Sequence, residues 1–86
     1  MKFNFPEGWK YLDENDRVTF HRRYLDGTDV IVEIKKSDKF EVWSSAEHRC
    51  SRPEQNKESE HTEQEEAIES AIKEMKGWNE YINQNS

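Results

Sequence analysis

The chain has 86 residues, of which 37% are charged and only 31% are apolar, with a net charge of −6 at neutral pH. This length suits one small domain and excludes a large core, and the negative charge disfavours unspecific attraction to nucleic acids or anionic lipids. A single cysteine excludes an intrachain disulfide, and the lack of any run of about 20 apolar residues predicts no membrane span. We therefore expect one folded, cytoplasmic domain over residues 1–86, with a core that depends on the 12% of residues that are aromatic.

The first half of the chain predicts a sheet. Short stretches in which apolar and polar residues alternate between turn signals are typical of strands. Four such stretches cover Trp9–Leu12, Arg17–Arg22, Val30–Lys35 and Phe40–Ser44. Between the second and third stretches, Asp26-Gly27 is a strong hairpin signal. Because connections this short cannot hold a crossover, we expect neighbouring strands to be antiparallel and to form a three- to four-stranded meander.

The second half predicts one long amphipathic helix, from about Thr62 to Asn83. Thr62 and Glu65 have the spacing of a capping box, in which the hydroxyl and the carboxylate each satisfy an unpaired backbone N–H at the helix start. The apolar half of the helix surface carries Ala67, Ile68, Ala71, Ile72, Met75, Trp78, Tyr81 and Ile82. A helix with one apolar stripe and a sheet with one apolar face cover each other. The predicted fold class is therefore α+β, a β-β-β-β-α chain whose C-terminal helix packs on the sheet face that carries Val32 and Val42.

The predicted helix is longer than the sheet beneath it. About 22 helical residues span roughly 33 Å, whereas a six-residue strand spans about 20 Å. We therefore expect the far end, with Trp78, Tyr81 and Ile82, to extend beyond the sheet, covered either by the N-terminal aromatic residues or by a second copy of the chain. The first option is favoured, and its residues are Phe3, Phe5 and Trp9. Gly77 falls on the solvent side of the predicted helix, where it should cost roughly 1 kcal/mol relative to alanine without a packing reason.

Residues 51–61 are almost wholly polar, which predicts a mobile surface loop. His48, Cys50 and His61 lie in or near it and could supply three zinc ligands. They lack the C-x2-C spacing typical of zinc sites, and no apolar residues shield them from water. The sequence also lacks the motifs of a serine nucleophile, a phosphate loop or a metalloprotease. We predict no catalytic residue, no metal site and no cofactor, and a zinc titration followed by NMR would test the prediction for the two histidines.

A candidate interaction surface lies on the sheet face opposite the predicted helix. Its residues are His21, Arg22, Lys35, Trp43 and Arg49. Basic side chains around an exposed aromatic ring are typical of single-stranded nucleic-acid binding. Glu33 and Glu41 belong to the same face and would neutralise it, however, and polar side chains on an uncovered face also serve solubility. Trp43 could equally pack against Ile31 on the neighbouring strand.

These features favour a non-enzymatic protein-interaction or regulatory module, because exposed Trp and Tyr are common interface anchors and open sheet edges accept partner strands. The expected partner is another protein or a second copy of the chain, and not a membrane. Two alternatives stay open. One is nucleic-acid binding through the uncovered sheet face, and the other is mimicry of nucleic acid by the glutamate-rich segment 54–66, which would inhibit a basic partner. A continuous positive strip on the uncovered face would favour nucleic acid, and a mixed face would favour a protein partner.

Overall fold

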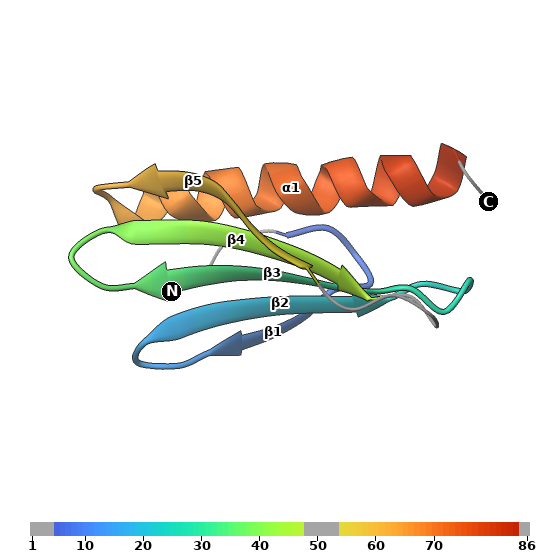
Figure 1. Ribbon diagram of the computed structural model, residues 1–86, viewed down its shortest axis with the longest axis horizontal. Helices are drawn as coiled ribbons and strands as arrows, with labels where there is room; N and C mark the ends of the chain where they lie inside the picture. Colours follow the sequence, from blue (N-terminus) through green and yellow to red (C-terminus); the bar gives the residue numbers. More distant parts are fainter. Residues whose placement is uncertain (1–4, 48–53, 85–86) are drawn as a thin grey trace.

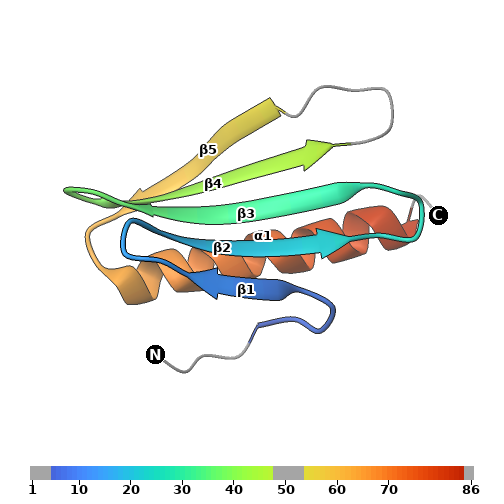
Figure 2. The same cartoon turned by 90° about the horizontal axis from the view of Figure 1, so that it is seen from below.

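The computed structural model of the chain describes residues 5–47 and 54–84. It consists of one five-stranded antiparallel sheet and one helix that lies along a single face of the sheet (Figures 1 and 2). The elements are β1 (Lys10–Asp13), β2 (Arg17–Arg23), β3 (Asp29–Lys36), β4 (Phe40–Glu47), β5 (Glu54–His61) and α1 (Gln64–Gln84). The strands lie side by side in chain order, so the sheet is a meander. The predicted α+β fold class, with one C-terminal helix on the sheet, is confirmed.

The prediction of a mobile loop over residues 51–61 is wrong for most of that segment, because residues 54–61 form the edge strand β5. β5 pairs antiparallel with β4. The sequence hid this strand because an edge strand is held by backbone hydrogen bonds, which need no alternation of apolar side chains. Two inward side chains of β5 also join the helix through polar contacts. The Ser59 hydroxyl lies 2.7 Å from that of Ser70, and the His61 ring lies 3.7 Å from the Glu66 carboxylate.

The apolar faces of helix and sheet meet as the sequence predicts. Val32 and Val42 on the sheet and Ile68 and Met75 on α1 are all buried. The helix lies over β3, β4 and β5. Burial of one such side chain contributes roughly 1.5–3 kcal/mol, so this contact supplies a large part of the stability. In residues 5–47 and 54–84 the structure has no helix with the length and hydrophobicity that a membrane span requires.

The N-terminal segment covers the sheet beside α1. The Phe5 ring lies 5.7 Å from an aromatic ring of β2, and Trp9 is buried with its ring 6.3 Å from that of Tyr24. The indole N–H of Trp9 donates to Oδ1 of Asn79 in the last turns of α1, at 3.3 Å. Trp9 therefore covers one side of the helix end, as expected, whereas Phe5 packs on the rings of Tyr11 and Phe20 in the sheet. Phe3 lies outside the described residues. The side of the helix end that faces β5 has a different surface, which forms the candidate site.

Candidate functional site

The sheet face opposite α1 carries mixed charge. His21 lies 3.1 Å from the Asp29 carboxylate. The Lys35 ammonium stands over the Trp43 ring, 4.3 Å from its centroid, and the Trp43 indole N–H donates to Glu41 at 3.1 Å. The three predicted surface residues on this face are thus each in contact with a neighbouring charge or ring. A positive strip with an open aromatic platform, which single-stranded nucleic acid would need, is not formed by these residues.

The other two residues of the predicted surface do not join this face. Arg22 points to the helix side of the sheet, where its guanidinium donates to Oδ1 of Asn79 at 2.9 Å and to the backbone carbonyl of Glu7 at 3.1 Å. It also stands over the Tyr24 ring at 4.6 Å. Strand alternation explains its direction, because Arg22 is two residues from the inward-facing Phe20. Arg49 lies outside the described residues.

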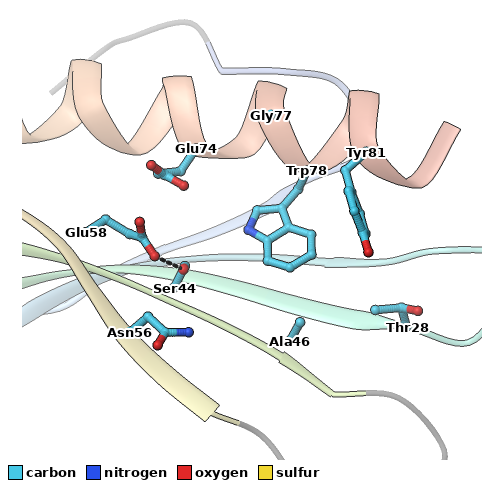
Figure 3. Close-up of a pocket in the computed structure, with 9 residues that line it drawn as sticks. All are labelled: Thr28, Ser44, Ala46, Asn56, Glu58, Glu74, Gly77, Trp78 and Tyr81. Carbon is cyan, nitrogen blue, oxygen red and sulfur yellow. Dashed lines mark hydrogen bonds between the residues drawn. The ribbon is translucent and has the colours of Figure 1, made fainter. Parts of the chain in front are cut away.

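A groove of about 500 Å³ lies between the C-terminal half of α1 and the β4–β5 side of the sheet (Figure 3). The residues that line it are Glu74, Gly77, Trp78 and Tyr81 on α1, and Thr28, Ser44, Ala46, Asn56 and Glu58 on the sheet side. Small residues contribute to both walls of the groove. Inward positions of β4 change from Phe40 and Val42 to Ser44 and Ala46, while Gly77 on the helix has no side chain at all.

A β-bulge in β5 directs a carboxylate into this groove. Val42 pairs with Ser59 but Trp43 pairs with Lys57, so Glu58 is the extra residue of the bulge. Bulges re-aim side chains and are common beside functional sites. The bulge leaves Lys57 on the outer face and turns Glu58 to the helix side, where its Oε1 accepts a hydrogen bond of 2.8 Å from the Ser44 hydroxyl (Figure 3). This bond fixes the orientation of the carboxylate.

Glu74 supplies a second carboxylate from the helix. Burial raises the pKa of Glu74, the negative charge of Glu58 raises it further, and nearby Lys73 opposes both effects. In the part of the chain that the structure describes, no Lys, Arg or His lies within ion-pair distance of Glu58 or Glu74. The groove therefore places the exposed carboxylate of Glu58 beside the partly buried carboxylate of Glu74, and a positively charged group in the groove would be attracted to both.

Two aromatic rings form the outer wall of the groove. Trp78 and Tyr81 follow Glu74 at helical spacings of four and three residues, which places all three on one face of α1. The two rings meet edge to face with centroids 5.8 Å apart. Trp78 is half-buried, whereas Tyr81 is 59% exposed. An apolar aromatic wall beside a pair of carboxylates can hold a group that is apolar along its stem and positive at its end.

Metal binding has little support in the described residues, which contain no group of three or more His, Cys, Asp or Glu placed to hold an ion. His61 sits on β5, where its ring nitrogen lies 2.8 Å from the Ser59 hydroxyl. His48 and Cys50 lie outside the described residues, so the absence of a metal site stays a prediction.

Sequence reasoning found only half of this groove. It predicted that Trp78 and Tyr81 would extend beyond the sheet at the end of the helix, but it did not single out Glu58 or Glu74. The spacing of Glu74, Trp78 and Tyr81 on one helix face was an available signal, whereas no sequence pattern marks the bulge. Comparisons with protein-family models, curated proteins and solved structures find no match to this chain.

Proposed function

We propose that this chain is a non-enzymatic, cytoplasmic protein-interaction module that binds a partner protein in the groove between α1 and the β4–β5 edge. The observation that carries the proposal is a hollow of about 500 Å³ with an aromatic wall and two carboxylates that no described cation neutralises. Trp and Tyr at the rim of a pocket are favoured anchors for protein partners. Pockets of this size accept individual side chains or short segments.

Gly77 provides independent support. A glycine inside a helix costs roughly 1 kcal/mol relative to alanine, and Gly77 is not one of the described glycines with a positive φ. A Cβ atom there would meet nothing within 4 Å, so neither backbone geometry nor packing calls for glycine. Gly77 lines the groove, and we infer that a long side chain at this position would narrow it. Local departures from stabilising choices are expected at functional sites.

The mixed charge of the opposite sheet face favours a protein partner over nucleic acid. On that face Glu41 and Asp29 accompany the basic side chains His21, Lys35 and Lys57. The groove itself is acidic, and an acidic hollow repels a phosphate backbone. A second copy of the chain is one form that the protein partner could take.

A random peptide library displayed on phage and selected on the wild-type protein would test this proposal. Two matched variants serve as counter-screens: Gly77→Ala, which leaves the groove open, and Gly77→Leu, whose side chain extends into it. Both restore helix propensity by similar amounts, so they differ mainly in the volume of the groove. We expect selected peptides to bind the wild type and Gly77→Ala and to lose binding to Gly77→Leu.

Two outcomes would change or overturn the proposal. Peptides that bind Gly77→Leu as tightly as wild type, or a failure to enrich any groove-dependent peptide, would remove the groove as the binding site. Light scattering on the wild type tests the second-copy form: a dimer that Gly77→Leu converts to a monomer identifies the partner as the chain itself.

A further inference from the structure

Resting on the proposed function, we propose that the groove recognises one arginine side chain of the partner protein. The guanidinium lies between the carboxylates of Glu58 and Glu74, and the methylene stem lies along the Trp78 ring. The inference names the chemistry of the ligand at the same site, and three features of the groove support it.

The first feature is charge. Many acidic side chains elsewhere in the structure have a cation close by: Asp29 lies 3.6 Å from Arg23, and Glu60 lies 3.0 Å from Lys57. Glu58 and Glu74, by contrast, face each other across the groove without such a partner among the described residues. Two carboxylates on opposite walls suit a planar group with donors on both edges, and arginine carries five N–H donors in a rigid fork.

The second feature is the aromatic wall. This molecule already contains two examples of a cation held on an aromatic ring, Lys35 over Trp43 at 4.3 Å and Arg22 over Tyr24 at 4.6 Å. In the first example a carboxylate, Glu41, also bonds the indole. Trp78 is also partly buried and lines the groove together with two carboxylates, but no cation of the described chain stands over its ring. A ligand guanidinium would complete the arrangement.

The third feature is the shape of the groove. Trp78 points from the helix toward the sheet, where Ser44 and Ala46 form a floor of small side chains, and Gly77 lines the groove without a side chain of its own (Figure 3). A long unbranched side chain can therefore enter between helix and sheet, with its stem against the ring and its head among the acceptors. Long cationic side chains bury their stems in this way while the charged head meets polar groups.

The test uses the peptides selected on the groove and a neutral replacement of the ligand group. Each arginine of a selected peptide is replaced by citrulline, which has nearly the same shape without the charge, and by lysine. Binding to the full ¹⁵N-labelled chain is followed by NMR through the Gly77 amide and the Trp78 indole N–H. We expect the selected peptides to contain an arginine that citrulline cannot replace without at least a tenfold loss of affinity.

Variants of the protein provide the matching half of the test. Glu58→Gln and Glu74→Gln should each weaken arginine-peptide binding by roughly fivefold, which corresponds to about 1 kcal/mol for a partly exposed ion pair. Glu80→Gln makes the same charge change on α1 outside the groove and should leave the affinity within about twofold.

The outcomes separate this inference from the proposed function. Groove-dependent peptides without arginine, or with an arginine that tolerates citrulline, would overturn the inference and leave the interaction module standing. Equal binding of lysine peptides would refute the selection of a guanidinium. Only the absence of any groove-dependent peptide would remove both.

Discussion

Replacing Gly77 with alanine should stabilise the protein. The residue lies inside α1, and a Cβ atom at this position meets nothing within 4 Å. No clash and no lost contact therefore offsets the gain in helix propensity, which is about 1 kcal/mol for glycine to alanine in a helix interior. For a domain of this size, a change of 1 kcal/mol shifts the Tm by roughly 4–8 °C.

Gly8→Ala is the matched control, because the same substitution should have the opposite sign there. Gly8 has a φ of +91°, a conformation that costs a residue with a side chain roughly 1–2 kcal/mol. A Cβ atom at this position would also lie 2.9 Å from Cζ of Arg22. The arginine would have to shift away from its contacts with Asn79 and the Glu7 carbonyl.

Thermal and urea unfolding followed by circular dichroism at 222 nm would measure both variants against the wild type. We expect a higher Tm for Gly77→Ala and a lower Tm for Gly8→Ala, with unchanged urea m-values because neither substitution alters the buried surface much. An unchanged or lower stability of Gly77→Ala would mean that a Cβ atom at residue 77 meets other atoms, or that the helix is frayed there. Glycine at this position would then carry no cost in stability for the groove to explain.

Three further substitutions test the core, the buried polar cluster and the groove. Met75→Ala removes a completely buried side chain of the helix–sheet contact and should cost about 2–5 kcal/mol in urea unfolding; a loss below 1 kcal/mol would contradict the packing. Oδ1 of Asn79 is the shared acceptor of hydrogen bonds from Trp9, Arg22 and Tyr24. Asn79→Ala leaves these donors unpaired and should lower the free energy of unfolding by about 1–3 kcal/mol. Asn79→Asp keeps an acceptor and should lower it by less. For Glu74, burial is the first cause and the charge of Glu58 the second cause that raises the pKa above its ordinary value of 4.5. The folded state therefore favours protonated Glu74, and the stability that protonation contributes is lost as the pH rises through the folded pKa. Glu74→Gln should therefore raise the Tm at pH 7 and lose most of that advantage below pH 4.5; equal Tm differences from wild type at pH 3 and pH 7 would refute the shift.

Glu74→Gln is expected to raise the stability of the free protein and to weaken the binding of an arginine peptide. Removing a partly buried charge stabilises the free protein, and removing an acceptor weakens the arginine complex. A residue that destabilises the fold while it serves a ligand is the usual form of the trade-off between stability and function. Glu58 differs from Glu74 because it holds the Ser44 hydroxyl at 2.8 Å, so its replacement by glutamine keeps a local hydrogen-bond partner.

The sequence by itself determined the layers of this protein. Alternation in the first half and helical periodicity in the second half predicted which side chains are buried, and Val32, Val42, Ile68 and Met75 are all in the core. Short connections determined the antiparallel meander, because neighbouring strands joined by tight turns have no other arrangement. These inferences succeed because side-chain burial follows local periodicity, which is written in the order of residues.

Only the tertiary structure decided the edge strand and the groove. β5 is held by backbone hydrogen bonds to β4, and backbone groups are the same in every residue, so its polar sequence resembles that of a loop. The bulge that turns Glu58 toward Glu74 is a shift of register between two strands, and it leaves no periodic signal. The groove forms where Glu74 and Trp78 of α1 come to lie opposite Ser44 and Ala46 of β4, which are far from them in the chain (Figure 3). Such a coincidence depends on how the layers are placed relative to one another, and local sequence patterns do not record that placement.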